Sequence, residues 1–73
     1  MKNKKNHPYF KALQKAIDVI GSQSAVARAV GVTQQTVYLW DYVPAHHVLK
    51  VEAATNGAVT RHELRPDLYP PNE

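Results

Sequence analysis

The most restrictive feature of this sequence is a pair of short helical segments with almost nothing between them. Residues 23–30 follow Ser22, a residue type that caps helix N-termini, and end at Gly31, which supplies the left-handed conformation that terminates helices. Two residues later, Thr33 is placed to cap a second segment that ends near Trp40. Helices this short are not stable alone in water. The two segments are therefore predicted to pack against each other and against the rest of the chain.

A longer helix is predicted ahead of this pair. It begins at Pro8, because proline fits the first position of a helix, and it ends at Gly21. Its apolar residues recur at spacings typical of one helix face, and they are Phe10, Leu13, Ile17 and Ile20.

A fourth helix is predicted to open at Pro44 and to close at Asn56-Gly57, since both of these residues tolerate positive φ. Its expected core contacts are Val48, Leu49 and Val51.

A fifth, short helix is predicted from Thr60 and Glu63, which have the spacing of a capping box, with Val59 and Leu64 flanking it as a hydrophobic staple. Pro66 ends it, because the residue before a proline is forced out of helical geometry. The segment 67–73 is expected to be extended, and its apolar residues Leu68 and Tyr69 are placed to pack back on the body.

Seventy-three residues with 44% hydrophobic content make one small domain. The predicted organisation is a flexible basic arm over residues 1–7, a helical domain over 8–69 and a disordered tail over 70–73. The chain has no cysteine, which excludes disulfides and thiolate metal sites, and no apolar run long enough to span a membrane. A cytoplasmic protein is expected. Its net charge of +3 makes a polyanion a natural partner.

The central pair meets the demands of a DNA-binding helix-turn-helix. Such a motif needs a small residue where its helices touch, and Ala27 is there; it needs a glycine in the turn, and Gly31 is there. The inward-facing apolar positions are filled by Val26, Val30, Val32, Val37 and Trp40. The predicted fold is therefore all-α, a compact bundle of five short helices that contains a helix-turn-helix.

The outward residues of the second helix of the motif are the candidate base readers. Its first turn reaches base edges in this motif, and glutamine bonds adenine bidentately, whereas threonine serves either base. The predicted base-reading residues are Gln34, Gln35, Thr36 and Tyr38. The predicted contacts to the DNA backbone are Gln23, Ser24, Thr33, Lys4 and Lys5. The alternatives are that the Gln and Thr residues are ordinary helix-surface residues, and that Tyr38 packs half-buried.

Residues 31–37 (GVTQQTV) resemble the turn and the start of the recognition helix in lambdoid phage repressors and Cro proteins. Together with the segments 17–23, 43–45, 51–57 and 59–67, this motif resembles the Cro and YdaS-like family of phage and prophage regulators over about residues 10–70. The resemblance implies a transcriptional repressor that binds pseudo-palindromic operators as a homodimer, at least on DNA. It also implies base reading by Gln34, Gln35 and Tyr38 and phosphate contacts by Gln23 and Thr33. Because no β-strands are predicted, an all-helical Cro is the better comparison.

The sequence gives less support to other kinds of site and function. The four histidines do not form a metal site, since His46 and His47 are adjacent and no cysteine or carboxylate cluster completes one. Serines without a partnering His or acid argue against an enzyme, and no cofactor is expected. Arg61 and Arg65 with Glu63 and Asp67 are interpreted as surface ion pairs or as a brace for the tail. The alternative functions are an antitoxin-like module that binds a partner protein, and an excisionase or architectural role.

Overall fold

The computed structural model describes residues 7–70 and places six helical elements there. They are α1 (Phe10–Ile20), α2 (Gln23–Val30), α3 (Gln34–Leu39), the 3-10 helix η1 (Ala45–His47), α4 (Val48–Ala54) and α5 (Arg61–Leu64). Within this described part there is no strand, so the all-α prediction with five α-helices is confirmed. None of the described helices has the length and apolarity to cross a membrane.

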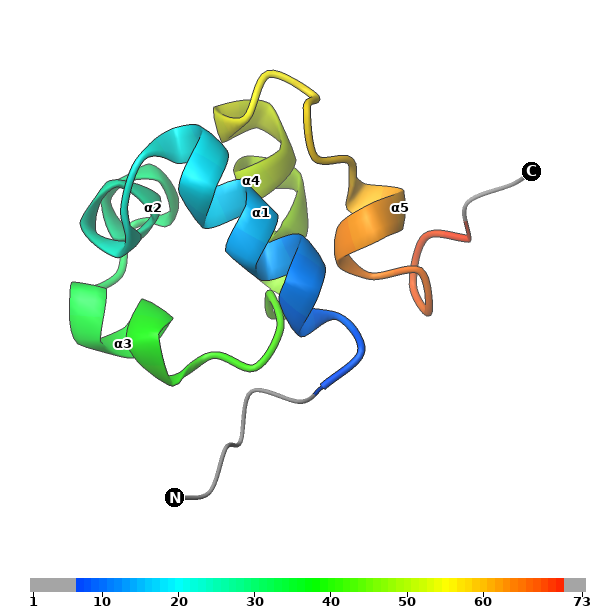
Figure 1. The fold of residues 1–73 in the computed structure, drawn as a ribbon, viewed down its shortest axis with the longest axis horizontal. Helices are drawn as coiled ribbons and strands as arrows, with labels where there is room; N and C mark the ends of the chain where they lie inside the picture. Colours follow the sequence, from blue (N-terminus) through cyan, green and yellow to red (C-terminus); the bar gives the residue numbers. More distant parts are fainter. Residues whose placement is uncertain (1–6, 71–73) are drawn as a thin grey trace.

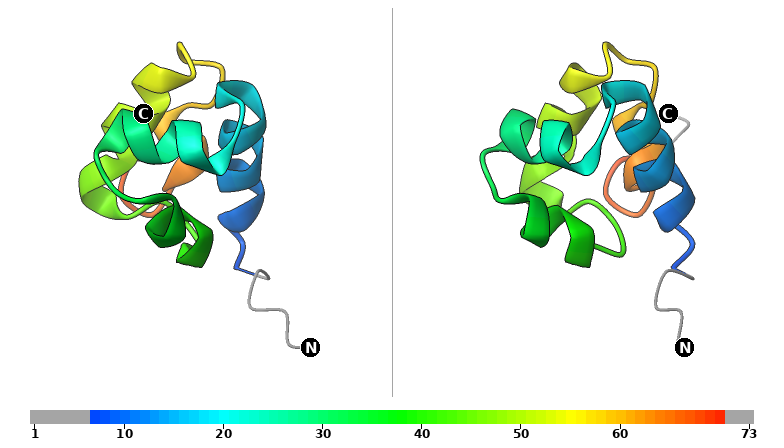
Figure 2. Two further views of the ribbon diagram at one scale, coloured as in Figure 1. Left: turned by 90° about the vertical axis from the view of Figure 1, so that its left-hand side faces the viewer. Right: turned by 60° about the vertical axis from the view of Figure 1, so that its left-hand side comes forward.

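The helices surround one core, with α1 and α4 in the middle, α2 and α3 at one end and α5 at the other (Figure 1). A second view shows α2 and α3 side by side at that end (Figure 2). The core is almost entirely aliphatic. Its fully buried large side chains are Leu13, Val26, Val37, Val43, Val48, Val51, Val59 and Leu64. Trp40 closes the core beside α3 and is 9% exposed, as the sequence predicted.

The predicted helix caps are confirmed around the central pair. The Ser22 hydroxyl accepts the Ala25 amide at 3.0 Å, and the Thr33 side chain accepts the Thr36 amide. Gly31 has φ +85°, and its amide donates to the carbonyl of Ala27 at 2.8 Å. These are local interactions, so α2 and α3 begin and end where the sequence indicated.

Two proline-based predictions were wrong in their details. The first helix begins at Phe10 instead of Pro8, because His7 accepts the Phe10 amide through its carbonyl and the Tyr9 amide through Nδ1. These bonds close a turn ahead of the helix. Pro44 opens the 3-10 turn of η1, and the α-helical part starts later at Val48.

The expected core contact by Leu49 was also wrong, because its side chain is 52% exposed. Its neighbours Val48 and Val51 are fully buried. Residues three apart lie on one face of a helix, whereas the next residue points about 100° away. The α4 face that contains positions 48 and 51 turns inward, and this leaves Leu49 in solvent.

The C-terminal predictions are partly corrected. Thr60 caps α5 by accepting the Glu63 amide at 3.2 Å, but the Glu63 carboxylate pairs with Lys15 at 3.7 Å. After α5 the chain is not extended: the amides of Leu68 and Tyr69 both donate to the Arg65 carbonyl and form a turn.

Tyr69 packs on the core, whereas Leu68 is 45% exposed. The predicted arm and tail fall mainly on residues 1–6 and 71–73, outside the described residues.

Replacing the cap of α2 gives a direct test of this local structure. Ser22→Ala is expected to lower the free energy of unfolding by about 1 kcal/mol, because the Ala25 amide loses its acceptor at the helix end. The matched control is Ser24→Ala, which changes an exposed serine in the same helix and is expected to shift stability by less than about 0.5 kcal/mol. Chemical denaturation followed by circular dichroism measures both. Equal losses would contradict the capping role.

Candidate nucleic-acid interface

The candidate interface is the outer face of α3. The inner face of the same helix packs on α2. Val37 is the buried residue of this six-residue helix, and α3 packs chiefly on α2. The candidate base-reading residues are not buried: Gln34, Gln35 and Thr36 are exposed, and Tyr38 is 53% exposed. Figure 2 shows α3 at the outside of the molecule, with neither α4 nor α5 in front of it. The structure therefore leaves this face accessible to a partner.

A hydrogen bond joins the first residues of the two helices. The Gln34 Nε2 donates to the Gln23 Oε1 at 2.6 Å. The two residues are eleven positions apart in sequence, so only the crossing of α2 and α3 brings them together. The bond fixes the Gln34 amide group and leaves its Oε1, together with the second N–H of its amide, directed to other partners. The sequence predicted both residues as DNA contacts but gave no signal of this link.

The threonines of the motif differ from the glutamines in how much of their hydrogen-bonding capacity is already used. Thr33 accepts the Thr36 amide at 3.2 Å, and the two hydroxyls lie 2.9 Å apart. Gln35, in contrast, has no side-chain hydrogen bond within residues 7–70. Its amide is therefore the group on α3 with the most capacity to bond a base edge.

The candidate backbone contacts that belong to residues 7–70 flank this face. Ser24 is exposed in the first turn of α2, and Gln23 is partly buried beside Gln34. No acidic side chain occupies the first turn of either helix, so nothing there repels a phosphate. Lys4 and Lys5 lie outside the described residues.

The histidines near α3 are not arranged as a metal site. The rings of His46 and His47 lie 4.1 Å apart, and His47 lies 5.6 Å from the Trp40 ring. Burial, followed by the positive charges of His46 and Lys50, lowers the pKa of His47 below its usual value. Among the described residues, no three His, Asp or Glu side chains come together as metal ligands would.

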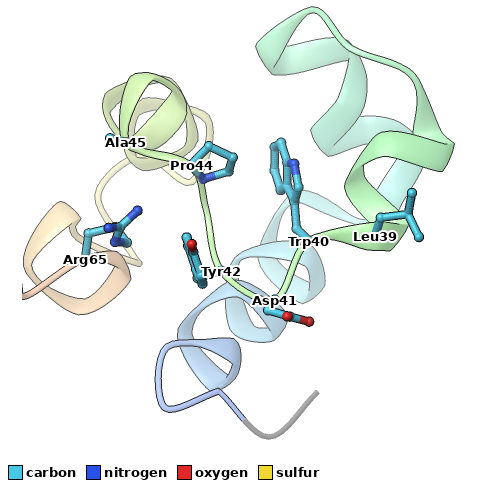
Figure 3. Close-up of a pocket in the computed structure, with 7 residues that line it drawn as sticks. All are labelled: Leu39, Trp40, Asp41, Tyr42, Pro44, Ala45 and Arg65. Atoms are coloured by element: carbon cyan, nitrogen blue, oxygen red, sulfur yellow. The ribbon is translucent and has the colours of Figure 1, made fainter. Parts of the chain in front are cut away.

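A cavity of about 420 Å³ opens beside the end of α3, between the chain that leaves it and the C-terminal turn (Figure 3). Its lining residues are Leu39, Trp40, Asp41, Tyr42, Pro44, Ala45 and Arg65. The sequence did not indicate this cavity. The sequence offered two interpretations of Arg65, a surface ion pair or a brace for the tail: its pairing with Asp67 is present at 2.8 Å, and the Arg65 side chain is 13% exposed. Arg61 pairs with Glu52 and not with Glu63.

The family model described as "Bacterial toxin YdaS" matches residues 13–73. The chain belongs to the YdaS family. This confirms the resemblance to Cro and YdaS-like proteins that the sequence motifs indicated.

Two relatives of this YdaS-family chain support the assignment. It is 41% identical to "Putative transcriptional regulator YdaS" of Escherichia coli (strain K12) over 61 residues, which cover 78% of the chain and 62% of that protein. The chain thus spans less than two thirds of the length of this curated relative. It is 43% identical to the Cro protein from a prophage element of Xylella fastidiosa strain Ann-1, with a TM-score of 0.73 over 78% of this chain and 92% of that one. The fold is therefore that of a Cro protein.

Proposed function

We propose that this protein is a sequence-specific DNA-binding transcriptional repressor of the Cro type. The observation that carries the proposal is the polar, exposed first turn of α3, in which Gln34 is held by Gln23 and Gln35 is open to a partner. A helix presented in this way fits the major groove and reads base edges through its N-terminal residues. The regulator and Cro names of the two relatives support the same function.

In this proposal the two classes of contact have different tasks. Gln34, Gln35, Thr36 and Tyr38 read base edges and give specificity. Phosphate contacts, which give most of the affinity but carry no sequence information, come from a second set of residues. These are Gln23, Ser24, Thr33, Lys4 and Lys5.

One α3 offers few base contacts, so two copies are needed for a specific site. We infer a homodimer on a pseudo-palindromic operator, with half-sites about 34 Å apart. Repression then follows when the bound dimer excludes polymerase from a promoter in the bacterial cytoplasm. The proposed activity is binding, and it needs no catalytic group, metal or cofactor.

Selection of bound sites from random duplexes tests this function. The expected result is an enriched sequence with two-fold symmetry and an affinity that falls steeply as salt rises, by about 0.9 log units per log unit of salt for each phosphate contact. Gln35→Ala is expected to relax the preference at one or two positions of each half-site while the circular dichroism spectrum stays unchanged. Failure of the wild-type protein to bind any duplex at low ionic strength would contradict the proposal.

A protein partner is the second candidate function. The matching family model is described as a bacterial toxin, and a toxin acts through another molecule of the cell, which makes a protein partner the second candidate to test. Affinity purification from the bacterial host separates the two functions. If one protein is specifically recovered with the chain, and the chain shows no salt-sensitive retention on DNA, the protein-interaction function is favoured. Both results together favour an antitoxin-like protein that also represses its own promoter.

A further inference from the structure

The position of α3 depends on how its C-terminal end is held. At its first residue, α3 is joined to α2 by the Gln23–Gln34 bond. At its other end, Trp40 is extended, and the chain passes through residues 40–44, here called the α3–η1 loop, before it reaches η1. Because α3 packs chiefly on α2, this loop is its second attachment to the body of the protein.

Arg65 holds this loop from the opposite end of the sequence. Its Nη1 donates to the Val43 carbonyl at 3.0 Å, across a separation of 22 residues. Val43 is fully buried, and its carbonyl lies in a loop, where no backbone amide of residues 7–70 donates to it. A side-chain donor is therefore needed to satisfy it. The Arg65 guanidinium also lies over the Tyr42 ring, 4.6 Å from its centroid (Figure 3). One side chain thus contacts two consecutive residues of the loop.

Arg65 is itself fixed in place. Its Nε donates to the Asp67 Oδ1 at 3.0 Å and its Nη2 to the Asp67 Oδ2 at 2.8 Å. This fork geometry needs a guanidinium, and a lysine ammonium does not reproduce it. The hydrogen bonds from Arg65 hold the pKa of the Asp67 carboxyl below its usual value, so the pair stays charged at neutral pH.

The support behind Arg65 continues into the body of the protein. Arg65 follows α5 directly, and α5 is joined to α4 by two bonds from Arg61 to Glu52, one from its amide and one from its Nη1, both at 3.1 Å. A connected path of contacts therefore runs from α4 through α5 and Arg65 to the loop that ends α3.

We propose that Arg65 is a positioning residue for α3, which fastens the C-terminal end of that helix to the turn after α5 and so fixes the angle at which α3 is presented. This inference rests on the proposed function, because it assigns Arg65 a part in DNA recognition without a contact to DNA. It differs from a purely stabilising role, in which Arg65 would affect binding only by changing the folded fraction.

The test compares Arg65→Lys with the matched control Arg61→Lys in the full chain. Each substitution keeps the positive charge. Arg61→Lys loses the single side-chain bond to Glu52 but keeps the bond from the residue 61 amide that joins α5 to α4, and of the two residues only Arg65 contacts the α3–η1 loop. Binding to the selected operator is measured below the unfolding transition of each variant. Arg65→Lys is expected to weaken binding by about three- to thirtyfold, the size typical of residues that act through a packed network, and Arg61→Lys by less than about twofold.

Amide hydrogen exchange without DNA provides the second readout. In Arg65→Lys, protection is expected to fall in α3 and its loop, including the Trp40 amide that donates to the Val37 carbonyl, while α1 and α2 stay protected. Unchanged operator affinity in the folded variant, or an equal loss of protection throughout the chain, would overturn the positioning role. If the wild-type protein binds no duplex, the proposed function fails separately, and the exchange pattern alone decides whether Arg65 holds α3.

Discussion

Gln34→Ala is expected to weaken operator binding by about 5- to 150-fold, because a bidentate contact between an amide side chain and a base contributes about 1–3 kcal/mol of discrimination. The substitution also releases Gln23, whose Oε1 accepts from Gln34 at 2.6 Å. Its effect on folding should stay within about 0.5 kcal/mol, because the side chain is exposed. Fluorescence anisotropy with a labelled operator duplex measures the loss.

Gln14→Ala is the matched control for this experiment. Gln14 is an exposed glutamine on α1, and its side chain bonds within its own helix, to Asp18 at 3.4 Å. Operator affinity is expected to change by less than about twofold, because no base contact is proposed there. Equal affinities for the Gln34 and Gln14 variants would remove α3 from the proposed reading face.

The largest effect on stability is expected for Leu13→Ala. Leu13 is fully buried on the inner face of α1, so the substitution removes apolar contacts and leaves a cavity in a small core. The free energy of unfolding should fall by about 3 kcal/mol, within the usual range of about 2–5. For a domain of this size, the melting temperature would fall by about 15 °C or more.

Leu49→Ala makes the same chemical change on α4, at a side chain that is 52% exposed. Its expected effect is below about 1 kcal/mol, because little buried surface is lost. Thermal and urea unfolding of the two variants side by side measures the difference. A loss as large as that of Leu13→Ala would mean that Leu49 is covered in solution, against the exposure seen in the structure.

Short-range signals were sufficient to predict the helix-turn-helix. Ser22, Gly31 and Thr33 act on amides or carbonyls within four residues, so their effect does not depend on the rest of the fold. Trp40 was also placed correctly in the core, because its position follows from the helical period. The types of residue at the candidate site were therefore visible in the sequence, although their contacts with DNA stay predictions.

The errors came where a local signal left the outcome to tertiary packing. Leu49 has an apolar side chain typical of a core residue. The orientation of α4 instead buries its neighbours Val48 and Val51 and leaves Leu49 exposed. The error at Pro8 has a different, local cause: the amides of Tyr9 and Phe10 donate to His7, and this turn delays the start of α1 to Phe10. The pattern of apolar residues narrows down which side chains can be buried and where a helix can begin, but it does not select one outcome.

The sequence by itself determined the helices, their caps and the polar residues of α3, because these depend on interactions a few positions apart. Only the tertiary structure decided that Gln23 meets Gln34 and that Arg65 reaches the Val43 carbonyl. These pairs are 11 and 22 residues apart, and they form where helices cross and loops close. Such contacts depend on the packing of the whole core, which no local spacing of residues specifies.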